Sequence, residues 1–231
     1  MKITEQIKIT NKEIAELVST NPYLNGKCEY LSYIKLNIPK ESQILYPDFP
    51  KDHPLYEPIS NINMRNQQTA FDYVTDNVKN TIVPESIKTI HQIVCAKDRD
   101  DGGQFRTQSK WMDINITPPD WRKIPDKFKV LCNELELSSP MKAAFELHYR
   151  IIKLQPFDNY NKRVARLVMN WMLLQNGYTP IVLNHKADKK EYIDALDKKA
   201  TDIDFYNNFF YEKMFRTQGE IVHLLKQYRR K

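Results

Sequence analysis

"KLQPFDNYNKRVARLVMN", residues Lys153–Asn170, is the stretch of sequence that decides the fold. A kinked, polar loop runs into an apolar segment in which Arg163 and Arg166 lie three positions apart. Cations beside a core are costly unless an anion or a hydrogen-bonding group meets them. Because the loop leads into a helix N-terminus, it is expected to bind an anion such as phosphate. Spacing alone slightly favours the other interpretation, a structural arginine pair on a solvated edge.

The spacing of apolar residues predicts helices on both sides of this loop. After it, "KRVARLVMNWMLLQN" is apolar on nearly all sides, which is typical of a central helix, and Gly177 can end that helix. Similar patterns predict further helices that begin near residues 67, 84, 124, 189 and 204. Before the loop, Ser139 and Pro140 begin a helix whose buried stripe is Met141, Ala144, Phe145, His148, Ile151 and Ile152.

One segment breaks the helical pattern. "DRDDGGQFRTQSKWMDINITPPDW", residues 98–121, opens near two glycines, has strand-forming residues in its middle and closes with two prolines. This pattern predicts a short β-hairpin, or flap, ahead of the central helix pair. The expected fold class is therefore an all-α bundle with one short β flap.

The N-terminal quarter has a different character. Residues 1–65 are predicted to form an arm, and residues 66–231 the main domain. Thr10 and Glu13 resemble a capping box, which predicts one short helix in the arm. Prolines then interrupt the sequence often enough to block long helices, which predicts an extended strap over the body; they are Pro39, Pro50, Pro54 and Pro58.

Composition excludes several classes of protein. The 231 residues carry a net charge of +6, but acidic residues interleave with the basic ones, so nucleic-acid binding is only a minor alternative. The three cysteines are far apart, which argues against a zinc ribbon and a disulfide framework and suits a reducing compartment. No signal-peptide core or membrane-spanning run is found, so a cytoplasmic protein is expected, and nothing in the pattern fixes its oligomeric state.

The central stretch resembles the signature of the Fic (Fido) family, His-Pro-Phe-x-Asp/Glu-Gly-Asn-Gly/Lys-Arg-x-x-Arg. The matching residues are Pro156, Phe157, Asn161, Lys162, Arg163 and Arg166. The resemblance continues in order from the flap segment "GGQFRTQSKWMDINITPPDW" to the helices after the motif, over about residues 65–215. This resemblance implies a Fic-type helical bundle in which the motif lies between the two central helices.

The resemblance also implies a chemistry. Family members transfer AMP, or less often another phosphate-containing group, from a nucleotide with Mg²⁺ to a hydroxyl of a target protein. Arg163 would hold the phosphates, Asn161 and Lys162 would contribute to the anion hole, and Arg166 would brace the motif or reach a terminal phosphate. The flap, through Gln108, Ser109, Lys110 and Trp111 and on to Asp113, would bind the target by strand pairing.

Three positions depart from the signature. Gln155 replaces the histidine that acts as general base, and a glutamine amide can orient a hydroxyl but cannot take its proton. Asn159 replaces the metal-binding carboxylate, which leaves Asn159 or the neighbouring Asp158 as a weak metal ligand. Asp158 is also a candidate substitute for the lost base. Tyr160 replaces a glycine, so its side chain is expected to crowd the phosphates, at a position where glycine permits positive φ.

The expected function is thus an atypical or impaired nucleotidyl (AMP) transferase with an anion-binding loop. Two alternatives stay open: a catalytically inactive Fic-fold binding or regulatory module, and a Doc-like phosphotransferase toxin, since the Asn161-Lys162-Arg163 sequence matches that of the Doc kinase-toxins. The histidines are expected to be structural. His148 is interpreted as a hydrogen-bonded core residue, and His91 as lacking the neighbours of a metal ligand.

Overall fold

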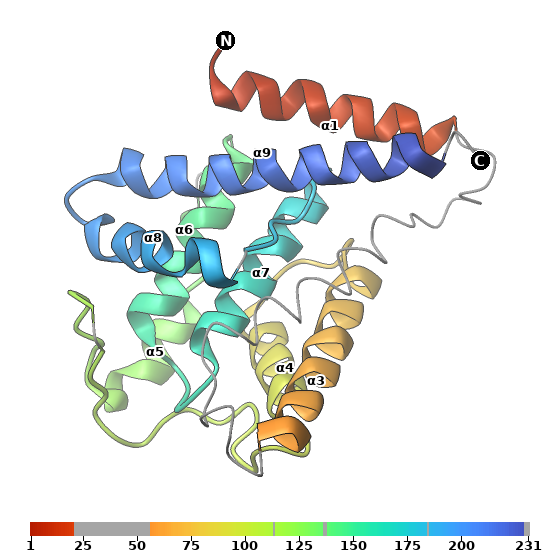
Figure 1. Cartoon of the computed structure of the whole chain (residues 1–231). Helices are drawn as coiled ribbons and strands as arrows, with labels where there is room; N and C mark the ends of the chain where they lie inside the picture. Colours follow the sequence, from red (N-terminus) through yellow and green to blue (C-terminus); the bar gives the residue numbers. More distant parts are fainter. Residues whose placement is uncertain (21–55, 113, 136–137, 184, 229–231) are drawn as a thin grey trace.

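The computed structural model describes residues 1–20, 56–112, 114–135, 138–183 and 185–228. These residues form an all-α bundle (Figure 1). The predicted fold class is confirmed in its helical character. The helices are α1 (Ile3–Ser19), α3 (Tyr56–Asp76), α4 (Pro84–Cys95), the 3-10 helix η1 (Trp121–Lys123), α5 (Ile124–Lys129), α6 (Pro140–Leu154), α7 (Asn161–Gln175), α8 (His185–Lys198) and α9 (Ile203–Tyr228).

Helix α7 lies at the centre of the bundle. It packs against α6 on one side and against α3 and α4 on the other (Figure 1). Every residue from 163 to 173 is buried, as the all-round apolar pattern predicts. Asn170, the polar residue in this run, exchanges two hydrogen bonds with the backbone of Ile181, at 3.1 and 2.8 Å. The buried amide is therefore satisfied, and it fixes the chain that follows α7 against the helix.

The start of α6 at Pro140 and the end of α7 before Gly177 match the prediction, but Ser139, predicted as the cap of α6, makes no side-chain capping hydrogen bond. The stripe predicted for α6 is buried in full. At the end of α7, Gly177 has a φ of 72° and its N–H bonds to Leu174 O, while Tyr178 N–H reaches Leu173 O. This pair of bonds is a Schellman motif, in which a left-handed glycine satisfies the last carbonyls of the helix.

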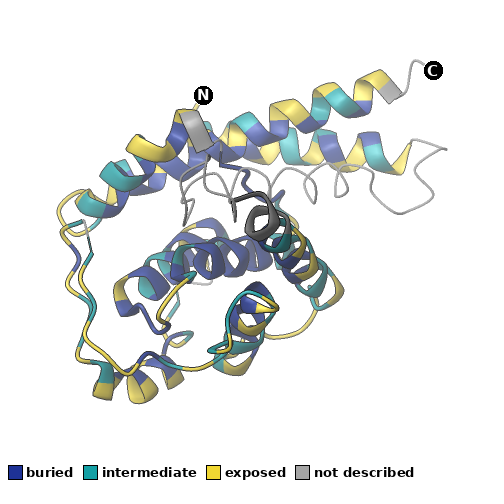
Figure 2. Cartoon of the chain, turned by 60° about the horizontal axis from the view of Figure 1, so that its bottom comes forward, coloured by how far each residue is buried: buried dark blue, intermediate teal, exposed yellow. Residues whose placement is uncertain are grey.

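Helix α1 is packed against α9 along much of its length (Figure 1). Its inward residues Ile7, Ile14 and Leu17 are buried, and the two helices present their exposed residues on the outer faces (Figure 2). The predicted capping box is wrong, because α1 begins at Ile3 and the hydroxyl of Thr10 donates to Gln6 O inside the helix. The helix itself is confirmed, and it is longer than the sequence pattern indicated.

The predicted β-hairpin is also wrong, since the described part of residues 98–121 contains no strand. The reason lies in where this segment's hydrogen bonds go. Arg106 N–H donates to Pro156 O at 3.0 Å, and the guanidinium of Arg106 donates to the carbonyls of Gln155, Gln108 and Pro119 at 2.7, 2.5 and 2.6 Å. Arg106 therefore joins the flap to the loop between α6 and α7 and crosslinks the flap through its side chain, in place of a ladder between two strands.

Two other predicted boundaries differ. The helix expected from residue 124 begins there as α5 but ends after six residues, at Lys129, and the 3-10 helix η1 precedes it. Helix α3 begins at Tyr56, so residue 65, the predicted edge of the arm, lies inside it. The proline strap falls mostly on residues 21–55, outside the described residues, and the division into arm and body stays a prediction. No helix in the described ranges is both long and apolar enough to span a membrane.

The packing of α1 on α9 gives the first testable prediction. Ile7→Ala should lower the free energy of unfolding by about 2–4 kcal/mol, because it leaves a cavity at a fully buried site. The matched control is Ile9→Ala on the same helix, where the side chain is 54% exposed and the change should stay within about 0.5 kcal/mol. Denaturant unfolding of both variants measures the difference, and equal effects would show that α1 is not part of the core.

Candidate functional site

A cavity of about 670 Å³ lies where the α6–α7 loop, the flap and α8 meet. The loop and the start of α7 form one wall, the flap forms another, and α8 closes the side. Four of the lining side chains are cationic, and no carboxylate is found among the described residues of the lining. The lining consists of Lys110, Trp111, Met112, Ile114, Gln155, Asn159, Tyr160, Asn161, Lys162, Arg163, Lys189 and Ile193.

Gln155 ends α6 in the left-handed conformation, with φ 44° and ψ 60°. Its side-chain Nε2 donates to Ile152 O at 2.9 Å, and its own carbonyl accepts from Arg106 Nε at 2.7 Å. The side chain is 3% exposed although it lines the cavity. Gln155 therefore acts as part of the helix cap, and one of its two side-chain N–H groups is bonded to a backbone carbonyl.

Asn161 closes the loop on itself. Its Oδ1 accepts from Phe157 N at 3.0 Å, and its Nδ2 donates to Phe157 O at 2.7 Å. The ring of Phe157 is buried and stacks on His91 of α4, with ring centroids 3.8 Å apart. These contacts hold the loop rigidly at the N-terminus of α7, where first-turn N–H groups have no intrahelical acceptor and the helix dipole is positive.

Tyr160 precedes α7 with φ 59° and ψ 8°, a conformation that glycine adopts without strain. Its hydroxyl donates to Asp98, and the guanidinium of Arg163 lies 4.3 Å from the centre of its ring. Arg163 also donates to Asn63 of α3 at 3.1 Å. The tyrosine thus occupies a strained backbone position that contacts to Asp98 and Arg163 stabilise.

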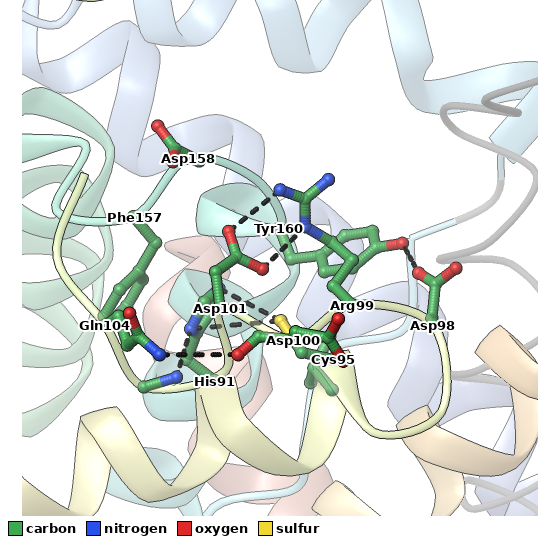
Figure 3. Close-up of polar contacts among 12 residues, drawn as sticks. His91, Cys95, Asp98, Arg99, Asp100, Asp101, Gln104, Phe157, Asp158 and Tyr160 are labelled. Carbon is green, nitrogen blue, oxygen red and sulfur yellow. Dashed lines mark hydrogen bonds and ion pairs between the residues drawn. The ribbon is translucent and has the colours of Figure 1, made fainter. Parts of the chain in front are cut away.

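Asn159 contacts a neighbouring ion pair. Arg99 forms a two-pronged ion pair with Asp101, with both N–O distances 2.8 Å (Figure 3). With the amide oriented by its hydrogen bonds, the Asn159 side-chain oxygen accepts from Arg99 Nη1 at 2.7 Å. The Arg99 guanidinium holds the pKa of the Asp101 carboxyl below its usual range. The oxygen that a metal ion would need on Asn159 is therefore bound to a cation.

The flap contributes Lys110 to the cavity. Its Nζ donates to Asp158 O and lies 3.5 Å from Phe157 O, so this ammonium is attached to the backbone of the loop. Trp111 beside it is 91% exposed. Gln108 and Ser109 do not line the cavity, and Asp113 lies outside the described residues.

Two predicted residues lie away from the cavity. Asp158 is exposed, is not among the lining residues, and points away from the Arg99–Asp101 pair (Figure 3). Arg166 is buried behind the loop, with its guanidinium 5.9 Å from the centre of the Tyr192 ring. This placement fits the bracing role that was one of the two expected for Arg166.

His148 lies in a closed network within the core. Its Nδ1 is 2.8 Å from the Tyr206 hydroxyl, which donates to Phe145 O, and its Nε2 is 2.9 Å from the Tyr192 hydroxyl. Since the Tyr206 proton goes to Phe145, His148 donates from Nδ1 and accepts at Nε2, which makes it a neutral imidazole. His148 is the core histidine that the sequence suggested, and both of its nitrogens are used.

Sequence reasoning missed the residues that brace the loop from α4 and the chain after it. They are His91, Cys95, Asp98, Arg99 and Asp101 (Figure 3). His91 accepts from Gly103 N–H at 2.9 Å and lies 3.3 Å from Cys95 Sγ. Burial lowers the pKa of His91 to about 4. The one signal in the sequence was the dense charge of "DRDD", residues 98–101, which the prediction had assigned to the flap.

The residues present fit an anionic ligand better than a metal ion. Four cationic side chains and a helix N-terminus favour phosphate groups. Mg²⁺ instead needs oxygen ligands, usually carboxylates, in an octahedral arrangement. Here Asn159 is bound to Arg99 and Asp158 faces away, and among the described residues no group of three His, Cys, Asp or Glu side chains could hold a metal.

Comparisons with known proteins agree with this geometry. Residues 81–173 match the model of the Fic/DOC family. Over 130 residues the chain is 29% identical to the protein adenylyltransferase Fic of Aedes aegypti, which covers 52% of this chain and 25% of that protein. The chain therefore spans about a quarter of the length of that curated relative.

Two solved structures share the fold. A Fic domain containing signaling protein from Bacteroides thetaiotaomicron has a TM-score of 0.78 at 17% identity, covering 96% of this chain and 98% of that chain. A fragment of Fic-1 from C. elegans has a TM-score of 0.72 at 15% identity, covering 95% and 73%. At these identities the likeness shows the fold alone.

The buried histidines predict a pH-dependent stability. Burial lowers the pKa of His91 to about 4 and that of His148 to about 3, whereas in the unfolded chain both groups take up a proton near pH 6.5. The unfolded state therefore binds more protons below pH 6.5, and stability should fall by about 1.4 kcal/mol per pH unit for each histidine as pH drops toward 4.

Denaturant unfolding of His148→Gln between pH 8 and pH 4.5 checks this expectation. The variant should be less stable at pH 8, because two buried tyrosines lose their partner, but its stability should decline less steeply with acid. His223→Gln, on the exposed face of α9, is the control and should follow the parent protein. A variant with the parent's slope would show that His148 is not held neutral.

Proposed function

Because the chain carries a Fic (Fido) domain, we propose that it binds a nucleotide and is an atypical or impaired nucleotidyl transferase for hydroxyls of a target protein. The observation that carries this proposal is the cation-lined cavity at the N-terminus of α7. Phosphates there would meet Arg163, Lys162 and the first-turn N–H groups, with Asn161 holding the loop in place.

Gln155 is the reason to expect impaired transfer. Its amide has no pKa near neutrality, so it cannot remove a proton from the attacking hydroxyl. One N–H of its Nε2 donates to Ile152 O, which leaves the amide oxygen and the second N–H to orient a hydroxyl. Loss of a positioned base typically costs about 10²–10⁴-fold in rate, so slow transfer by positioning and charge alone is compatible with this site.

Two alternative functions predict different results in binding and transfer assays. A catalytically inactive binding module is favoured by Tyr160, which packs on Arg163 and so takes part of the space beside the phosphate-binding arginine. In that case ADP binds and no group is transferred. A Doc-like phosphotransferase toxin is suggested by Asn161-Lys162-Arg163, and would transfer the terminal phosphate instead of AMP.

The flap supports a place for the target protein. Lys110 and Trp111 border the cavity, and Trp111 exposes 91% of its surface beside the proposed phosphate site. We propose that a target segment lies along the flap so that its hydroxyl faces the cavity. With no strand in the described part of the flap, side-chain contacts to Trp111 and Lys110 would bind it, in place of the strand pairing expected from the resemblance.

Calorimetry with ADP tests the phosphate site. Arg163→Ala should weaken ADP binding at least about 10-fold, because a charge-assisted contact to phosphate is lost. Arg122→Ala, at an exposed position of η1, is the matched control and should bind as the parent does. Equal affinity in all three proteins would remove Arg163 from the site.

Transfer of labelled AMP to lysate proteins, or to the chain itself, tests the cause of impairment. Gln155→His alone should restore little activity, because Asn159 and Tyr160 remain and all three residues act on the same transition state. Changing Gln155, Asn159 and Tyr160 together to His, Asp and Gly, with Arg99→Met so that the new carboxylate is not paired with Arg99, should restore more than the sum of the single changes. Strong labelling by Gln155→His alone would mean that Asn159 and Tyr160 are tolerated.

A further inference from the structure

We infer that the α6–α7 loop is closed to a divalent cation, and that protein cations alone hold the nucleotide phosphates in this chain. The inference rests on the proposed nucleotide binding and goes beyond it, since the resemblance implies a Mg²⁺-bound nucleotide. Three contacts carry it: one from Arg99, one from Lys110 and one from Asp98.

Arg99 is hydrogen-bonded to the side-chain oxygen of Asn159, the candidate metal ligand. Its Nη1 lies 2.7 Å from the Asn159 oxygen, which is normal hydrogen-bond distance. A dication that used the same oxygen would have to approach a guanidinium group, and the like charges would repel each other at that distance. The amide also lacks the negative charge with which a carboxylate would offset this repulsion.

Arg99 is itself held in place. Asp101 binds it through two parallel N–H···O bonds of 2.8 Å, the geometry that fixes a guanidinium most firmly. The next residue along the chain from Asn159, Tyr160, is tied to Asp98, the residue before Arg99. Two of the three departures from the signature, Asn159 and Tyr160, are thus bound by one short segment, residues 98–101. Figure 3 shows the contact of Tyr160 with Asp98 and the pairing of Arg99 with Asp101.

Lys110 supplies positive charge within the cavity. Its ammonium is attached to the carbonyls of Asp158 and Phe157, directly before Asn159 in the loop. An ammonium bound there can pair with a phosphate oxygen through its remaining proton, without the bound waters that Mg²⁺ retains. Lys110 and Arg163 would then contact the phosphates from the flap and from α7.

Titration of ADP into the unmodified chain tests the inference directly. ADP should bind with the same affinity, within about twofold, in 5 mM Mg²⁺ and in EDTA, and Lys110→Met should weaken binding about 10-fold in both buffers. Binding that is at least 10-fold tighter with Mg²⁺ would overturn the inference and leave the proposed nucleotide site standing. Absence of ADP binding in both buffers would overturn both this inference and the proposed nucleotide site.

A gain of metal binding tests the role of Arg99. Asn159→Asp alone should bind no Mn²⁺, because the new carboxylate pairs with Arg99. Asn159→Asp combined with Arg99→Met should bind Mn²⁺. Binding is measured as a decrease in the electron paramagnetic resonance signal of free Mn²⁺. Asn159→Asp combined with Arg122→Met is the matched control and should behave like Asn159→Asp. Mn²⁺ binding by Asn159→Asp alone would show that Arg99 does not close the site.

Discussion

The buried guanidinium of Arg106 is the constraint on which the rest of the site depends. It is 1% exposed, and it joins three carbonyls that are far apart in sequence: Gln155 at the end of α6, and Gln108 and Pro119 in the flap. The bond to Gln155 O is buried and the other two are partly buried, so removal of the arginine would leave at least the Gln155 carbonyl unsatisfied, at a cost of about 1–3 kcal/mol. The flap and the α6–α7 loop therefore hold their places together, and the cavity exists between them.

Within this frame, the altered signature residues make coherent local contacts. Gln155 caps its helix through Ile152, Asn159 accepts from Arg99, and Tyr160 bonds to Asp98 and packs on Arg163. The positive φ of Tyr160 is a strained conformation, and strain of this kind persists only when surrounding contacts over-determine it. At the positions where the family signature has a histidine and a carboxylate, this loop has amides that make structural contacts, and four cationic side chains line the cavity beside it.

Local patterns predicted the helices α6 and α7, the burial of His148 and the left-handed end at Gly177, because helical spacing and chain stops depend on neighbouring residues. The β-hairpin was predicted wrongly, since strand-like residues between glycines and prolines do not reveal that Arg106 bonds to the motif loop. The Arg99–Asn159 contact joins residues 60 positions apart. No pattern in a single sequence identifies partners so far apart, so this contact could be found only from the structure.

The central claim is that the N-terminus of α7 is a phosphate site served by protein cations. A crystal structure of the chain with ADP, grown in metal-free buffer, tests it most directly. The account predicts the two phosphates between Lys110 and Arg163, with Asn159 still bound to Arg99. A nucleotide found outside this cavity, or a diphosphate that becomes ordered there only when Mg²⁺ is added and Asn159 has left Arg99, would contradict it.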